Sequence, residues 1–207
     1  SITVDNPVDT SKPAVYTVTY TVSDSADNEA TATRKVTAAD SIAPVITLLG
    51  EVEIVHEAGP DYTDAGATAV DSLEGDLTVQ IVAVNPVKTL EPALYTITYN
   101  VKDSSDNAAV EVTRKVTVAD TTPPAVTLKG EAEVTVEAGG TYTELGATAL
   151  DIVDGDLSAE IVMAGTVDTS KPGEYDISYI SSDVSGNESV PVVRKVKVVD
   201  TTAPVIT

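Results

Sequence analysis

Apolar and polar side chains alternate along several short stretches of the chain. In residues 94–101 the apolar side chains share one face of an extended backbone, and they are Tyr95, Ile97, Tyr99 and Val101. The next stretch repeats this alternation with Val110, Val112, Val116 and Val118. A period of two residues is typical of half-buried strands, whereas no window of ten residues or more holds a helical period. The pattern predicts an all-β protein.

The same pattern recurs along the chain with a period of 80 residues. Asp40, Asp120 and Asp200 each begin a junction of the form Asp-(Ser/Thr)-(Ile/Thr)-x-Pro, and all eight tyrosines fall in register between copies. Turn-forming residues recur at intervals of roughly 8–15 residues, which divides each copy into about seven short strands. Short alternating strands at this spacing predict tandem antiparallel β-sandwiches.

The repeat predicts the boundaries of the modules. Residues 41–120 and 121–200 are complete copies, residues 1–40 match only the second half of a copy, and residues 201–207 match the first strand of a further one. Forty residues cannot cover both faces of their own strands. We therefore expect residues 1–40 to be completed by residues outside this sequence or by a neighbouring chain.

The corner that precedes one strand carries a resemblance to a known family. Pro172-Gly-Glu-Tyr175, followed by Tyr179, resembles the corner entering the sixth strand of immunoglobulin-like folds. With the hairpin Asp183-Val-Ser-Gly-Asn187 and the aspartate junctions, the repeat resembles bacterial immunoglobulin-like surface modules, close to the hyalin-repeat and cadherin-like groups. The resemblance implies immunoglobulin-like sandwiches, with the first tyrosine of the corner bonded to the corner backbone. It also implies modules of adhesins, of surface filaments or of secreted hydrolases.

The charge and composition narrow the classes of partner. The chain has 33 acidic and 12 basic residues, a net charge of −21 and no cysteine. Such a field repels nucleic acid and anionic lipid, so neither is expected as a partner. No apolar run is long enough to insert into a membrane, and no signal-like segment opens the sequence. With the resemblance, this favours a secreted or cell-surface protein, whose export signal would lie outside this sequence.

Catalysis is not expected. The single histidine, His56, is replaced by Val136 in the next copy, so it is not a repeated functional group. The sequence contains no glycine-rich phosphate loop and no metalloprotease helix motif. We interpret His56 as a partly buried strand residue and the chain as a non-enzyme.

Three acidic patterns repeat, and each fits either an ordinary turn or a calcium ligand set. The first is the hairpin that begins at Asp24, Asp103 and Asp183, and the second is the linker aspartate at Asp40, Asp120 and Asp200. The third places three carboxylates around a glycine, at Asp71, Glu74 and Asp76 and again at Asp151, Asp154 and Asp156. Calcium binds six to eight oxygen ligands. The candidate metal ligands are Asp40, Asp71, Glu74, Asp76, Asp120, Asp151, Asp154, Asp156, Asp183 and Asp200.

The expected topology brings some of these acids together. The last strand of a copy delivers Asp120 to one end of the sandwich, where we expect the loop of residues 71–76 of the same copy. The loop around Glu137 and the hairpin at Asp183 should face it from the next copy. Asp120 should therefore lie within about 6 Å of a carboxylate from one of these loops, and calcium there would stiffen the junction.

Two further residue types recur with the repeat. Arg34, Arg114 and Arg194 fall on the inward register of a strand, where an arginine either pairs with a carboxylate or extends its head to solvent. A lysine–asparagine isopeptide bond is conceivable beside them, but no residue pattern favours it. Four tyrosines should be largely buried, each with a partner for its hydroxyl: Tyr95, Tyr99, Tyr175 and Tyr179.

Two functions fit the sequence. The first is a structural spacer or filament segment of a long adhesin-like repeat protein, stiffened by calcium at its junctions. Its partners would be neighbouring modules, with lateral or head-to-tail self-association between chains. The alternative is an accessory module of a secreted enzyme that binds polysaccharide or protein. Sugar-binding sandwiches usually expose aromatic side chains, and only Tyr62 and Tyr142 are available here, so the spacer is favoured.

Overall fold

The computed structural model describes residues 1–205. Strands make up 48% of the chain and helix 3%, which confirms the all-β prediction. The helices are two single 3-10 turns, η1 (Thr78–Gln80) and η2 (Ser158–Glu160). Within the described residues no helix has the length and apolar character needed to cross a membrane.

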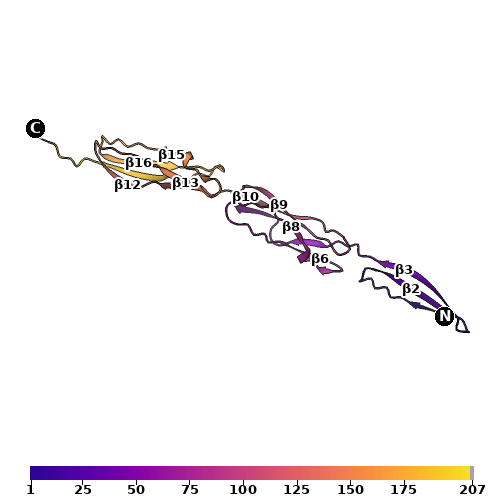
Figure 1. Ribbon diagram of the computed structural model, residues 1–207. Coiled ribbons are helices and arrows are strands. Elements are labelled where there is room, and N and C mark those ends of the chain that lie inside the picture. Colours follow the sequence, from indigo (N-terminus) through magenta and orange to yellow (C-terminus); the bar gives the residue numbers. More distant parts are fainter. Residues whose placement is uncertain (206–207) are drawn as a thin grey trace. The chain divides into compact units, whose positions relative to one another are not determined.

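The copy of residues 121–200 forms a sandwich of two sheets, drawn in orange to yellow in Figure 1. One sheet has the order β11-β13-β14 and the other the order β12-β17-β16-β15. The strands are β11 (Ala125–Leu128), β12 (Glu133–Glu137), β13 (Ala147–Asp151), β14 (Gly155–Asp156), β15 (Val162–Ala164), β16 (Gly173–Ile180) and β17 (Val192–Val199).

The copy of residues 41–120 has the same strands, each 80 residues earlier in the sequence. They are β4 (Val45–Leu48), β5 (Glu53–Glu57), β6 (Ala67–Asp71), β7 (Gly75–Asp76), β8 (Val82–Val84), β9 (Ala93–Asn100) and β10 (Val112–Ala119). Their sheet orders, β4-β6-β7 and β5-β10-β9-β8, also match. The 80-residue period of the sequence is therefore a period of the structure.

Residues 1–40 form a single sheet of β1 (Ile2–Asp5), β2 (Ala14–Ser23) and β3 (Glu29–Ala38). Val18 is buried, but Val22 is 41% exposed and Arg34 is exposed. Of the strand predicted in residues 201–207, the last two residues lie outside the described part, and residues 201–205 form no strand.

By the density of their contacts, the residues group into two compact units. One consists of Ser1–Ile54, Thr63–Val87 and Tyr95–Val116, and the other of Val55–Tyr62, Lys88–Leu94 and the chain from Thr117 onward. This division passes through the copy of residues 41–120. The module boundaries inferred from the sequence therefore stay a prediction.

The core of the 121–200 copy lies between its two sheets. Ala147, Ile177, Tyr179 and Val196 are buried at its centre. The chain passes from one sheet to the other at the turn between β11 and β12, where Gly130 adopts φ +82°, a conformation that favours glycine. This crossing allows β12 to pair in parallel with β17, from Glu133 opposite Lys195 to Glu137 opposite Val199.

The tyrosines follow the predicted pattern in part. Tyr175 donates a hydrogen bond to the Lys171 carbonyl at 2.9 Å, which is the corner bond that the resemblance implies. Tyr99 and Tyr179 are buried, whereas Tyr95 and Tyr175 are only half-buried. The prediction that every hydroxyl has a partner is wrong for Tyr179, because its buried hydroxyl makes no hydrogen bond.

Candidate metal centres

Two groups of three aspartates gather their carboxylates at equivalent places in the two complete copies. The first cluster is Asp40, Asp71 and Asp103, and the second cluster is Asp120, Asp154 and Asp183. Within each cluster, one oxygen of every carboxylate lies within 4.8 Å of the others. Oxygen ligands at about 2.3–2.6 Å from one calcium ion lie no more than about 5 Å apart, so each cluster has the spacing of a calcium ligand set.

Strand pairing explains why these residues meet. β13 runs antiparallel to β11, with Leu150 opposite Ala125, so the end of β13 lies beside the start of β11 and the linker that precedes it. β16 runs antiparallel to β17, which places the hairpin containing Asp183 at that same end of the sandwich. The linker aspartate therefore meets two loops of the copy that follows it.

This arrangement corrects one expectation and agrees with another. The loop of residues 71–76 was expected beside Asp120, but Asp71 lies with Asp40. The reason is that β6 is antiparallel to β4, with Val70 opposite Val45, so Asp71 returns to the end where the copy begins. The expected approach of Asp120 to the Asp183 carboxylate is found.

An asparagine holds the linker against the hairpin in both clusters. Asn187 donates through Nδ2 to Asp183 Oδ2 at 2.7 Å and to the Asp120 carbonyl at 3.1 Å. Asn107 makes the same pair of bonds, to Asp103 Oδ2 at 2.6 Å and to the Asp40 carbonyl at 3.3 Å. The position of the linker is therefore fixed by hydrogen bonds as well as by the chain.

One acid in each copy connects the two loops. Asp154 Oδ2 accepts a hydrogen bond from the Val184 backbone N–H at 2.9 Å. Its counterpart Glu74 accepts one through Oε1 from the Ser104 N–H at 2.8 Å. Glu74 is not part of the first cluster, in which Asp71 takes part instead.

Several carboxylate oxygens at these places are buried without a hydrogen-bond partner. They are Oδ2 of Asp40, of Asp71 and of Asp151. Asp71 is only 2% exposed, and its Oδ1 is already used by the backbone N–H groups of Leu73 and Glu74. A buried carboxylate oxygen without a partner costs free energy, and a bound cation would remove this cost.

The local charge affects the ionisation of Asp120. Burial, together with the negative charges of Asp151 and Asp183, raises the pKa of the Asp120 carboxyl above its ordinary value. By contrast, hydrogen bonds from the Glu74 and Leu73 backbone N–H groups lower the pKa of Asp71. Ionisation of the linker aspartate Asp120 is therefore disfavoured, first by burial and then by the neighbouring negative charges.

The other candidate residues have different positions. Asp76 and Asp156 accept hydrogen bonds from the N–H of Thr78 and of Ser158, each at 2.9 Å, at the start of η1 and η2. Asp200 binds the Thr202 N–H at 3.3 Å and belongs to neither cluster. Asp103 was not among the candidate ligands, although its equivalence to Asp183 in the 80-residue period could have identified it.

A second feature of the linkers corrects an expectation. The loop around Glu137 was expected to face Asp120, but β12 runs parallel to β17 and therefore ends beside the chain that leaves the copy. Glu137, at the end of β12, accepts hydrogen bonds from the Thr201 N–H at 2.7 Å and from its hydroxyl at 2.8 Å. Glu57, at the end of β5, makes the same bonds to Thr121 at 3.0 and 2.6 Å. We call each of these arrangements the exit clamp, because it ties the chain leaving a copy to a strand near its beginning.

Two of the three repeated arginines are buried and paired. Arg114 forms an ion pair with Asp64, and Arg194 forms one with Glu144. Each also donates to the carbonyls of the turn that precedes β5 or β12; Arg194 Nε lies 2.9 Å from the Glu131 oxygen. The paired alternative therefore holds in both complete copies, whereas Arg34 is exposed.

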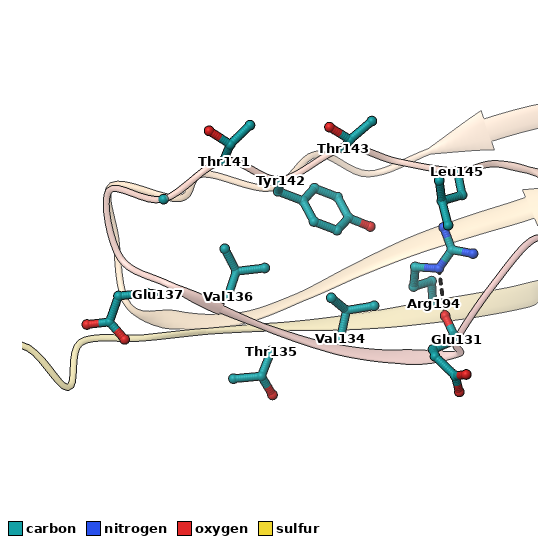
Figure 2. A pocket seen from close by; sticks show the side chains of 11 residues that line it. Glu131, Val134, Thr135, Val136, Glu137, Thr141, Tyr142, Thr143, Leu145 and Arg194 are labelled. Atoms are coloured by element: carbon teal, nitrogen blue, oxygen red, sulfur yellow. Dashed lines mark hydrogen bonds between the residues drawn. The ribbon is translucent and has the colours of Figure 1, made fainter.

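A lateral cleft of about 510 Å³ lies beside this arginine in the 121–200 copy. Figure 2 shows the Tyr142 ring facing Val134 and Val136 across it, while Thr141 and Thr143 point away. Arg194 lies at one end, with its hydrogen bond to Glu131 dashed. In the other copy His56, at the place of Val136, packs edge-on against Tyr62 with ring centroids 5.3 Å apart.

Comparison with known proteins gives a match to one family model, the bacterial surface protein, Ig-like domain. It matches three times in tandem, over residues 1–38, 46–118 and 126–198. The chain belongs to this family. The match confirms the predicted resemblance to bacterial immunoglobulin-like surface modules.

The chain is also similar to individual proteins. The chain is 33% identical to the pesticidal crystal protein Cry22Aa of Bacillus thuringiensis over 86% of its own length and 25% of that protein. It is 30% identical to hyalin of Strongylocentrotus purpuratus over 97% of its length and 18% of hyalin. A solved structure from Clostridium perfringens ZmpB, with an M60 catalytic domain and two CBM51 domains, matches at 13% identity with TM-score 0.44, over 95% of this chain and 34% of that one. The chain thus spans a quarter or less of these curated relatives.

Proposed function

We propose that this chain is a non-catalytic structural segment of a long, adhesin-like protein on the cell surface or outside the cell. Calcium bound at the first and second clusters would fix each linker to the copy that follows it. The partners of each copy are then its neighbours in the same chain, and association between chains is a further expectation. The carrying observation is the repeated cluster itself.

Three features of the clusters support calcium. Each combines a linker aspartate with carboxylates from two loops, so one ion would join three segments of the chain. The asparagine bonds to the linker carbonyl hold these segments in place before an ion binds. The unpartnered oxygens of Asp40, Asp71 and Asp151 are hard ligands in buried surroundings. Calcium prefers such oxygens and completes its shell with carbonyls and water.

The lateral cleft favours the alternative of a binding module. It places the half-buried Tyr142 ring beside two valines, and a sugar ring could stack there. One tyrosine in one copy is a smaller surface than carbohydrate-binding sandwiches usually present. Binding of a glycan panel that Tyr142→Ala abolishes would reverse the order of the two proposals.

The test of the calcium proposal is titration calorimetry and thermal unfolding with calcium and then with chelator. An ion that binds only the folded chain stabilises it by about 2.7 kcal/mol at a hundredfold excess over its Kd. We expect two binding events per chain, and a melting temperature that rises with calcium concentration. Asp120→Asn should remove one event.

Asp106→Asn is the matched control. Asp106 lies in the hairpin of the first cluster but outside the cluster, is exposed, and pairs with Lys102 at 3.4 Å. The Asp106→Asn substitution removes one negative charge, as Asp120→Asn does, but removes no ligand, so both binding events should remain. If Asp106→Asn and Asp120→Asn weaken calcium binding equally, the effect is a diffuse one of net charge and the clusters are ordinary turns.

A further inference from the structure

We infer that each complete copy is a mechanical element built to resist pulling along the chain, with the buried arginine as its latch. This inference rests on the proposed function, because only a segment that connects distant parts of a surface protein carries force. It assigns the resistance to residues outside the calcium clusters. The argument is made for the 121–200 copy, which lies within one compact unit.

The strand order places the resisting bonds between the two ends of the copy. The chain enters through β11 and β12 and leaves through β17, and β12 and β17 are neighbours in one sheet. They pair in parallel over five residues of β12, Glu133–Glu137. When the ends are pulled apart, two parallel neighbours slide past each other in opposite directions. All the hydrogen bonds of that ladder then carry the force together, whereas a pulled hairpin would lose them one at a time.

Arg194 locks the entry side of this ladder. It lies on β17 and is 1% exposed. Its guanidinium donates to the Lys129 and Glu131 carbonyls, in the turn that joins β11 to β12. Figure 2 shows the bond to Glu131. It also forms an ion pair with Glu144. A pull on the entering chain must therefore break charge-assisted bonds to β17 before β12 can slide.

The exit clamp locks the other end. Glu137 is the last residue of β12, and its carboxylate holds the N–H and hydroxyl of Thr201, just beyond β17. The leaving chain is thus tied to the strand that the entering chain loads. The arginine latch and the exit clamp therefore lie at the two ends of the parallel β12–β17 ladder.

The other complete copy repeats these contacts. Arg114 is fully buried and donates through Nε to the Glu51 carbonyl at 2.8 Å. Glu57 forms the exit clamp with Thr121 and Thr122. Arg34, in the sheet of residues 1–40, is exposed. The latch therefore accompanies the complete sandwich.

Constant-force unfolding of the whole chain, held by its two ends, tests the inference. The chain has no cysteine, so one cysteine added at each end attaches the handles. Each complete copy should lengthen the chain by a step of roughly 260–290 Å, less its folded length, as expected for 80 extended residues. Arg194→Lys keeps the charge beside Glu144 but loses the fork that reaches two carbonyls.

We expect Arg194→Lys to raise the unfolding rate of one of the two steps at least about tenfold and to leave the other step unchanged, because forced unfolding follows the unfolding barrier. Ile177→Val is the matched control, since Ile177 is buried in β16, outside the ladder. The two variants are compared in melting temperature and in unfolding rate under force. If Ile177→Val lowers the melting temperature as much as Arg194→Lys and also speeds forced unfolding as much, the latch is refuted. Glu137→Ala, at the more accessible exit clamp, should speed the same step by several-fold; no change there also contradicts the inference.

Repeating the measurement in calcium and in chelator separates this inference from the proposed function. The effect of Arg194→Lys should appear in both solutions, because Arg194 binds Lys129, Glu131 and Glu144, and none of these residues belongs to a cluster. Loss of all calcium dependence with the latch effect intact would overturn only the calcium proposal. A calcium effect without a latch effect would overturn only the mechanical inference.

Discussion

The two complete copies solve the burial of one arginine in two ways. In the first, Arg114 pairs with Asp64, and the Tyr99 hydroxyl donates to that carboxylate. In the second, Arg194 pairs with the longer Glu144, and this carboxylate accepts a hydrogen bond from the Tyr142 hydroxyl. Tyr179, the counterpart of Tyr99, is left buried without a hydrogen-bond partner.

The two copies share the buried arginine and differ in the carboxylate and the hydroxyl around it. The arginine and the turn carbonyls that it binds are the same in both copies, because a buried guanidinium needs acceptors and the turn between the two sheets supplies them. The carboxylate needs only to neutralise the guanidinium, so either acid serves. The hydroxyl partner changes with the length of that acid, and the longer one leaves a polar group unsatisfied.

The largest expected effect is the loss of either arginine. Arg114→Ala and Arg194→Ala should each cost about 3–5 kcal/mol, because each leaves a half-buried carboxylate without its ion pair and removes the donors to two backbone carbonyls. Chemical denaturation of the two variants measures this cost. Arg34→Ala, at the exposed counterpart, should change stability by less than about 0.5 kcal/mol. Equal effects at all three positions would contradict the pairing.

Removal of the hydroxyl of Tyr99 or of Tyr179 should change stability less, and the two changes should have opposite signs. Tyr99→Phe should cost about 1–3 kcal/mol, because Asp64 loses a donor beside a buried charge. Tyr179→Phe should be neutral or stabilising by up to about 1 kcal/mol, because it removes a buried hydroxyl that has no partner. Urea unfolding of both variants compares them directly, and an equal loss would mean that Tyr179 also has a partner in solution.

The smallest effect concerns pH in the presence of chelator. Burial and the charges of Asp151 and Asp183 raise the pKa of Asp120, so the folded chain binds this proton more tightly than the unfolded chain. The resulting stability is present at low pH and is lost as the pH rises through the folded pKa. Asp71, with its lowered pKa, contributes with the opposite sign and loses stability as the pH falls. Asp120→Asn should therefore make the melting temperature fall less steeply as the pH rises from 4 to about 6; an unchanged slope would contradict this assignment.

Much of the fold could be read from the sequence, because it rests on local alternation. Residues 94–101 place Ile97 and Tyr99 on one face, and both are buried. The inward register of Arg114 predicted either a charge pair or a head group extended to solvent, and the structure has the charge pair. Its partner Asp64 could not be found, since it comes from a segment without strand periodicity, 50 residues away along the chain.

The carboxylate clusters were only partly predictable for a similar reason. The acids themselves repeat visibly, but their grouping depends on which end of the sandwich each strand reaches. The sequence does not state that β6 turns back beside β4, so Asp71 was placed with Asp120 in place of Asp40. The exit clamps were missed because Glu57 and Glu137 resemble ordinary strand-end charges.

Small-angle scattering of the whole chain, measured with calcium and then with chelator, tests the central claim most directly. If calcium fixes each linker to the following copy, its removal should shorten the mean maximum dimension and broaden the distance distribution, as expected for a hinge that opens. Asp120→Asn in calcium should shift the profile part of the way toward that of the chelated chain, and Asp106→Asn should not. Identical profiles with calcium and with chelator would contradict the account, and the linkers would then be held by their hydrogen bonds alone.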